Sequence, residues 1–138
     1  LLTSCKILRM RFLKRENQMK RIKIDIEFEK IENLDPELKQ TLAKMGLRTA
    51  FEKMLESGLT SIHKDGLGGR ILKRHFEILT AIDNSVDGWI EVENENFELI
   101  KSAFLGENVR FRHNVTRVAM MYRRNIEAAE KEAELKTD

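Results

Sequence analysis

The sequence has one cysteine, one proline and no long apolar run, and these scarcities exclude several classes of protein. Cys5 is alone, so an internal disulfide is excluded, which favours a reducing cytosol over a secreted, disulfide-stabilised scaffold. No apolar run approaches the ~20 residues that span a bilayer. The sequence also lacks CxxC and HExxH motifs, so a structural zinc site is not expected.

Charged residues are abundant by contrast. They make up 35% of the 138 residues, beside 41% hydrophobic residues, which is typical of a soluble helical protein. The length is enough for one domain with one core.

Residues 1–18 precede Met19, and we interpret them as a non-native or disordered N-terminal extension. Lys14–Gln18 has the composition that a purine-rich ribosome-binding site gives when it is translated, which predicts that translation begins at Met19. The alternative is a genuine basic amphipathic arm that would suit nucleic acid or an anionic surface. The arm would combine Ile7, Met10, Phe12 and Leu13 with Lys6, Arg9, Arg11, Lys14 and Arg15.

The basic character of the chain comes from this extension. Residues 1–18 carry five basic side chains and one acidic side chain, a net of +4, whereas the whole chain carries +2, so residues 19–138 carry about −2. An isoelectric point of about 8.7 would by itself favour a nucleic-acid partner. That interpretation is weakened because the remaining residues are near neutral and mixed in sign.

Apolar and charged residues alternate over residues 22–29, which predicts a half-buried strand. Its expected partner is Trp89–Val92, where strand-forming residues follow the turn-rich cluster Asp83–Gly88. Two strands need a helix on their apolar face to be stable. The apolar positions of the first strand are Ile22, Ile24, Ile26 and Phe28.

A helix is expected to begin at Pro36, which suits the first helical position, with Asp35 as its cap. Gly46 lies inside the apolar stripe that follows and can divide the helix, because glycine costs roughly 1 kcal/mol relative to alanine. The stripe should end near Ser57–Gly58. Its core residues are Leu38, Leu42, Met45, Ala50, Phe51, Met54 and Leu55.

The longest irregular segment is expected at Leu59–Gly69, which contains three of the seven glycines. Glycines before a helix can cradle a phosphate group. The segment lacks the GKS or GKT ending of such a loop and the buried strand that should precede it. It therefore predicts a flexible connection between two helices.

The segment Ile71–Phe104 predicts a helix, a turn, a short strand and a second helix. Trp89 should be largely buried against the first of these helices, beside Phe76 and Leu79. Asn94 should cap the second helix and Gly106 should stop it. The apolar face of the first helix comprises Ile71, Leu72, His75, Phe76, Ile78, Leu79 and Ile82.

No residue cluster predicts catalysis. His63, His75 and His113 share no metal-binding spacing, and the acidic run from Asp83 to Glu95 does not match an EF-hand loop. We therefore predict a protein that is not an enzyme and has no cofactor or metal.

A long terminal helix is predicted over Asn114–Lys136. Its heptad seam should pack on the domain up to Ile126, leaving residues 127–138 as a projecting helical tail. Arg110, Arg117 and Arg124 are seven residues apart and share a face if the helix starts early enough. The seam comprises Val115, Ala119, Tyr122, Ile126, Ala129 and Ala133. The predicted partner-binding residues are Arg110, Arg117, Tyr122, Arg124, Ala129 and Ala133.

The order of these elements is similar to that in small uncharacterised proteins of tailed phages and prophages. Those proteins often show a helix rich in lysine or arginine, an acidic DG-x-[VI]-E-[LV] strand and a capped helix of the DxxLIK kind. The matching segments are Lys73–Ile82, Asp87–Val92 and Asn94–Lys101, whereas the long terminal helix and the glycine-rich loop depart from the pattern. The resemblance implies a small accessory or virion-associated protein and carries over no catalytic residue.

The expected fold class is α+β and mostly helical, with about four helices and a small two-stranded antiparallel sheet in a single domain over residues 19–126. The favoured function is a non-enzymatic protein-interaction factor of a phage, in the cytoplasm of the bacterial host or in the virion. It would bind a protein partner or self-associate through the terminal helix, without contacting a membrane. The alternative is a nucleic-acid-binding regulator that uses arginines of the terminal helix, or Arg70, Lys73 and Arg74.

Overall fold

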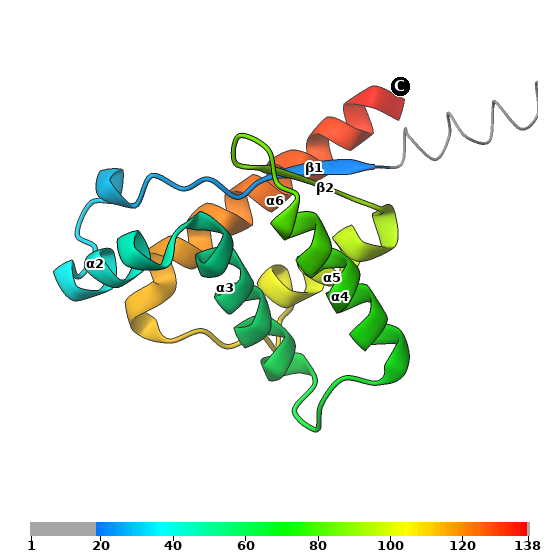
Figure 1. Cartoon of the computed structure of the whole chain (residues 1–138), viewed down its shortest axis with the longest axis horizontal. Helices are drawn as coiled ribbons and strands as arrows, with labels where there is room; N and C mark the ends of the chain where they lie inside the picture. The colour runs from blue at the N-terminus through cyan, green and yellow to red at the C-terminus, as the bar shows by residue number, and fades with distance from the viewer. Residues whose placement is uncertain (1–18, 138) are drawn as a thin grey trace, which may run out of the picture.

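The structure is a computed structural model that describes residues 19–137, and their side chains except those of Glu29 and residues 133–137. The interpretation of residues 1–18 lies outside the described residues. Within residues 19–137 the chain forms five α-helices and a two-stranded antiparallel sheet, so the predicted α+β, mostly helical class is confirmed (Figure 1). In chain order the elements are β1 (Lys20–Lys23), a 3₁₀ turn (Phe28–Lys30), α2 (Pro36–Met45), α3 (Leu47–Ile62), α4 (Gly69–Asp83), β2 (Trp89–Val92), α5 (Asn94–Leu105), a second 3₁₀ turn (His113–Val115) and α6 (Thr116–Thr137).

The sheet pairs the two predicted strands, but β1 is shorter than the alternation suggests. Lys20 pairs with Val92 and Lys23 pairs with Trp89, where β2 begins. The chain before Trp89 folds into a two-residue turn, in which Asp87 and Gly88 both have positive φ. Because β2 offers no residue beyond this turn, the segment after β1 continues without a ladder. The four predicted apolar side chains, Ile22 in β1 and Ile24, Ile26 and Phe28 after it, are nevertheless all buried.

Gly46 divides the second predicted helix into α2 and α3. Its φ of 86° and ψ of 163° lie in a region that only glycine adopts without strain. Pro36 occupies the first position of α2, as expected, while the Asp35 side chain makes no capping hydrogen bond. The break at Gly46 gives one helix more than the sequence predicted.

The helix α3 extends beyond the expected end at Ser57–Gly58 and reaches Ile62, so the irregular connection before α4 is shorter than predicted. Gly58 lies inside the helix because α5 crosses it there. A Cβ atom at Gly58 would lie 2.0 Å from the carbonyl oxygen of Ala103. Glycine at this point lets the two backbones approach closely.

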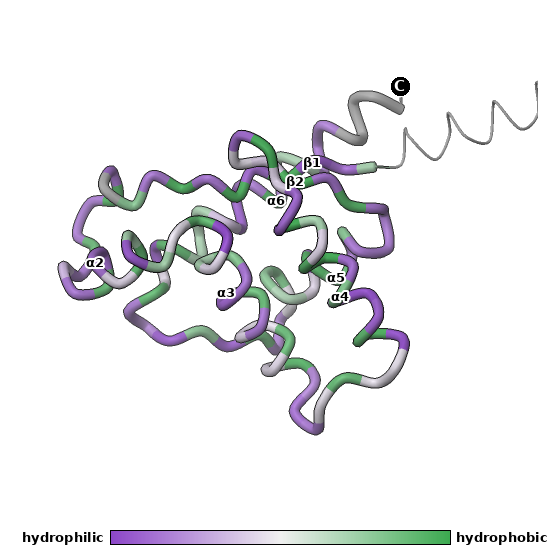
Figure 2. Tube along the Cα trace, in the orientation of Figure 1, coloured by the Kyte–Doolittle hydropathy of each residue, from purple (hydrophilic) through white to green (hydrophobic). Residues whose placement is uncertain are grey.

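The core lies where the apolar faces of α3, α5 and α6 meet the inner face of the sheet. The ring of Phe51 stacks on Phe104 with centroids 5.5 Å apart, and the ring of Tyr122 meets Phe51 edge-on at 5.3 Å. Figure 2 shows apolar and polar residues alternating along the segment after β1 and around the helical turns. This alternation keeps charged side chains on the outside of a small domain.

Two predictions for the segment Ile71–Phe104 are wrong in detail. Trp89 is only partly buried, because Ile90 and Val92 take the inner positions of β2 and the alternation turns Trp89 outward. Leu72 and Phe76, expected on the buried face of α4, are 57% and 69% exposed. The buried face of α4 is therefore narrower than the apolar face predicted from its sequence.

The ends of α5 also differ in part from expectation. Asn94 is the first residue of α5 and the capping position belongs to Glu93, whose side chain makes no capping hydrogen bond. The helix does end before Gly106, as predicted. Among residues 19–137, no helix is long and apolar enough to cross a bilayer.

Candidate functional site

The terminal helix α6 is held along β1 by its apolar seam. Tyr122, Ile126 and Ala129 of the predicted seam are buried, together with Val118 outside it, whereas Val115 and Ala119 are only partly buried. The Nδ2 of Asn125 donates a hydrogen bond to the carbonyl oxygen of Lys23 at 2.9 Å. These contacts join two segments from opposite ends of the described chain (Figure 1). They fix the surface that α6 and the residues after β1 present together.

The seam is buried further along the helix than predicted, so two of the proposed contact residues are covered by the domain itself. Tyr122 is fully buried, and Ala129 is 5% exposed. Beside Ala129, the Nζ of Lys101 on α5 lies 2.7 Å from the Oε1 of Glu130. Neither apolar residue can meet a partner while the domain is folded, and the docked part of α6 reaches at least Glu130. The side chain of Ala133 lies outside the described side chains.

Tyr122 is also electrostatically unusual. Burial raises the pKa of its hydroxyl above the ordinary value, and the nearby carboxylate of Asp25 raises it further. Among the described residues the hydroxyl has no hydrogen-bond partner. Tyr122 therefore belongs to the core, where it stays protonated.

A groove of about 1000 Å³ lies between the segment that follows β1 and the N-terminal part of α6. We call it the α6 groove. Residues of the stretch 23–35 form one wall, and residues of the stretch 113–125 form the other. Its size is within the range of pockets that take small molecules or a few side chains of a partner.

Arg117 and Arg124, two of the predicted contact residues, both line the α6 groove. Met120 lies between them in sequence and is 42% exposed. Positions three and four apart share a helical face, so the three side chains form one stripe. In the described part of the chain, neither arginine side chain forms an ion pair or a hydrogen bond with another residue.

The opposite wall is mixed in charge. Asp25, Glu27, Glu32 and Asp35 supply carboxylates, while Lys23 and Lys30 supply cations. The carboxylate of Glu27 and the ammonium of Lys30 lie 2.6 Å apart, and this contact lowers the pKa of Glu27 and raises that of Lys30. The groove therefore has basic groups on α6 facing acidic groups across it.

Arg110 does not join this stripe. The helical turns of α6 begin only at Thr116, after a 3₁₀ turn, so the seven-residue spacing from Arg110 to Arg117 is not helical. The backbone N–H of Arg110 donates a hydrogen bond to the Oγ of Ser61 at 3.1 Å, at the end of α3. Arg110 lines a different groove from Arg117 and Arg124.

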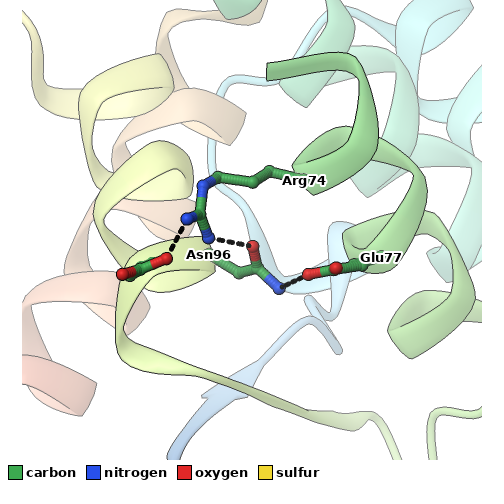
Figure 3. A network of polar contacts seen from close by, with 4 residues as sticks. Arg74, Glu77 and Asn96 are labelled. Carbon is green, nitrogen blue, oxygen red and sulfur yellow. Dashed lines mark hydrogen bonds and ion pairs between the residues drawn. The ribbon is translucent and has the colours of Figure 1, made fainter. Parts of the chain in front are cut away.

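The second basic cluster considered from the sequence is also divided. Arg74 is engaged by the carboxylate of Glu95 and by the Oδ1 of Asn96 (Figure 3). Arg70 and Lys73 remain exposed on α4. The three residues therefore do not act as one free patch.

Histidines and acids do not gather into a metal site in the described chain. Within residues 19–137, no group of three or more histidine, cysteine, aspartate or glutamate side chains could hold a metal ion. His75 is partly buried on α4, and its Nε2 has no hydrogen-bond partner among the described residues.

Sequence reasoning missed Met120 and the acidic wall of residues 25–35. A signal for Met120 was present, because it is an apolar residue outside the seam with arginines at i−3 and i+4. The acidic wall had no such signal, since its position depends on how α6 packs across β1.

Comparison of the chain with protein-family models, curated proteins and solved structures found no match.

Proposed function

We propose that this protein is a non-enzymatic protein-interaction factor that binds a partner protein in the α6 groove. The observation that carries the proposal is the stripe formed by Arg117, Met120 and Arg124 on one wall of the groove. A partner segment that fits this stripe has an apolar side chain flanked by carboxylates. The arginines would pair with the carboxylates and the methionine would cover the apolar side chain.

The same proposal includes a phage accessory or virion-associated role, in the cytoplasm of a bacterial host or in the virion. Its support is the resemblance of the segments Lys73–Ile82, Asp87–Val92 and Asn94–Lys101 to small phage proteins. A small domain with a groove along its terminal helix suits an accessory role.

A nucleic-acid-binding regulator is the second candidate, because Arg117 and Arg124 point into one groove without ion-pair partners in the described chain. The acidic wall disfavours it. A phosphate backbone seated against the two arginines would meet Asp25, Glu27 and Glu32 across the groove, and like charges repel. A protein segment can present both signs of charge and match both walls.

Fluorescence anisotropy with a labelled duplex and a labelled single strand separates the two candidates. At about 150 mM salt, true nonspecific binders have dissociation constants of ~10⁻⁴–10⁻⁶ M. We expect no binding in this range by the full chain once residues 6–15 carry glutamine in place of lysine and arginine. Micromolar binding that disappears in Arg117→Glu with Arg124→Glu would replace the protein-partner proposal with the nucleic-acid one.

Site-directed photocrosslinking tests the groove directly. A photoreactive amino acid at Met120 should give a discrete protein adduct in cells that carry the native gene neighbourhood, and the adduct should disappear in Arg117→Glu with Arg124→Glu. The matched control is the same amino acid at Glu98, which is exposed on α5 away from the groove. Equal adducts at both positions would show random collision and contradict the proposal.

A further inference from the structure

A second groove lies between α4 and the strands, where Trp89, Glu91 and Arg21 face outward. It has a volume of about 530 Å³, and we call it the Trp89 groove. Its apolar lining includes Trp89, Val86 and Met19, and Val86 is 68% exposed. This groove shares no lining residue with the α6 groove.

The charge of the Trp89 groove is opposite to that of the α6 stripe. Glu77, Glu91 and Glu93 line it, and Arg21 is the one cation among its described lining residues. Glu93 forms no ion pair within the described part of the chain. The lining therefore carries a net charge of about −2, which favours a basic ligand.

One of these carboxylates is held in position by a buried polar side chain. Asn96 is 4% exposed, and its Nδ2 donates a hydrogen bond to the Oε2 of Glu77 at 2.9 Å. The Oδ1 of Asn96 accepts a hydrogen bond from Arg74, which also contacts the carboxylate of Glu95 (Figure 3). The network holds the Glu77 carboxylate of α4 against Asn96 on α5 and leaves its Oε1 without a described partner. A fixed carboxylate loses little freedom when it binds a cation.

The groove already holds one guanidinium group of its own chain. The guanidinium carbon of Arg21 lies 5.1 Å from the centroid of the Trp89 ring, and its Nε lies 3.6 Å from the Oε1 of Glu91. Tryptophan is the aromatic side chain that attracts cations most strongly. Glu77 and Glu93 also line the groove, and neither is paired with a cation among the described residues.

We propose that the Trp89 groove binds an arginine- or lysine-rich segment of a partner protein. The aliphatic stem of a basic side chain would cover Val86 and Trp89, and its cation would pair with Glu77 and Glu93. This inference does not depend on the α6 groove. The two grooves together would let one small domain contact an acidic segment and a basic segment at the same time.

The test uses the full chain and a fluorescein-labelled peptide of alternating alanine and arginine, with an alanine–glutamate peptide as the matched control. The arginine peptide should bind and change the emission of Trp89, which is the only tryptophan in the chain. Glu77→Gln should weaken binding about tenfold, since a hydrogen bond to a charged group is lost. The glutamine oxygen can still accept the hydrogen bond from Asn96, so the fold is preserved.

A matched variant distinguishes binding in the Trp89 groove from nonspecific attraction between the basic peptide and the acidic side chains of the protein. Glu98→Gln removes one exposed carboxylate of α5 outside the groove and should leave binding unchanged. Equal weakening by Glu77→Gln and Glu98→Gln, or no weakening by either, would overturn the proposal.

Two other occupants would give distinct results. A Trp89 emission that changes with protein concentration and not with the peptide would assign the groove to a second copy of the chain. Peptide binding that appears only after Lys14→Glu with Arg15→Glu would assign it to the N-terminal segment of the same chain. Either result would overturn the assignment to a partner protein.

Discussion

At the scale of single residues, Tyr122 combines a large packing contribution with a polar atom in an apolar place. Its ring lies 5.3 Å from that of Phe51 and 5.8 Å from that of Phe104. Its hydroxyl is buried without a partner among the described residues. A buried hydroxyl without a hydrogen bond costs free energy, so Tyr122 stabilises the fold through its ring and not through its oxygen.

Tyr122→Phe should therefore raise the free energy of unfolding by roughly 1 kcal/mol at pH 7, because the unpaired hydroxyl is removed and the ring stays. The pKa of Tyr122 is raised in the folded state, so the folded state favours the protonated hydroxyl. The protein therefore keeps its full stability below the ordinary pKa of tyrosine and loses stability as the pH rises beyond that value. The advantage of the phenylalanine variant should grow above pH ~10. Urea titrations at pH 7 and pH 10.5 measure both effects. A less stable variant at pH 7 would show that the hydroxyl is hydrogen-bonded.

The outward position of Trp89 lowers the contribution to stability that is expected of it. Trp89→Ala should lower the free energy of unfolding by only about 1–2 kcal/mol, since the ring is partly in water and its contact with Arg21 is exposed. The comparison is Phe51→Ala, which should cost about 3–5 kcal/mol because Phe51 is fully buried. Equal losses in a denaturant titration would contradict the outward orientation of Trp89.

At the scale of elements, the break between α2 and α3 is set by one residue. Gly46 turns the chain with a positive φ, so α2 folds back beside the 3₁₀ turn while α3 enters the core. The apolar stripe from Leu38 to Leu55 contributes core residues to both helices, so the apolar pattern of the sequence continues across the break.

Gly46→Ala should destabilise the protein by about 1–3 kcal/mol, because alanine is strained at this φ and ψ. Gly69→Ala is the matched control. Gly69 is the first residue of α4, and a Cβ atom there would meet nothing within 4 Å, so this change should stabilise by about 0.4–1 kcal/mol. Thermal unfolding of the two variants checks the opposite signs. A neutral Gly46→Ala would mean that α2 and α3 can rearrange without cost.

At the scale of the whole molecule, the two grooves present different charge patterns. The α6 groove has arginines facing carboxylates, whereas the Trp89 groove is net acidic. The α6 groove carries the free arginines, and the Trp89 groove carries the fixed carboxylate of Glu77. Both depend on β1, because α6 packs along this strand and the outer face of the strand closes the second groove. Loss of the β1–β2 pairing would open both sites together.

The burial of the heptad seam bears on self-association. Tyr122, Ile126 and Ala129 are used inside the domain, so in residues 19–132 no heptad seam is left for a coiled coil with a second copy. We expect sedimentation velocity at micromolar concentration to give one species near 16.2 kDa. A dimer that dissociates in Met120→Glu would contradict this and place the second copy in the α6 groove.

What the sequence determined by itself is the local periodicity of the chain. The alternating burial from Ile22 to Phe28, the helix start at Pro36 and the stop at Gly106 follow from backbone geometry and side-chain spacing and are confirmed, although the strand itself ends at Lys23. The fold class follows from the same patterns, since a short strand and several amphipathic helices have few ways to bury their apolar faces. Arg117 and Arg124 could be selected from the sequence as candidate contact residues, because their spacing and their position outside the seam are local properties of the chain.

Only the tertiary structure decided which apolar residues are covered and which polar residues meet. β1 ends at Lys23 because its partner turns at Gly88, and no property of β1 itself reveals this. Phe76 is exposed and Tyr122 is buried, although both lie on apolar helix faces, because the cover comes from elements distant in sequence. The α6 groove exists for the same reason: its walls lie some 90 residues apart in the chain and are joined only by packing.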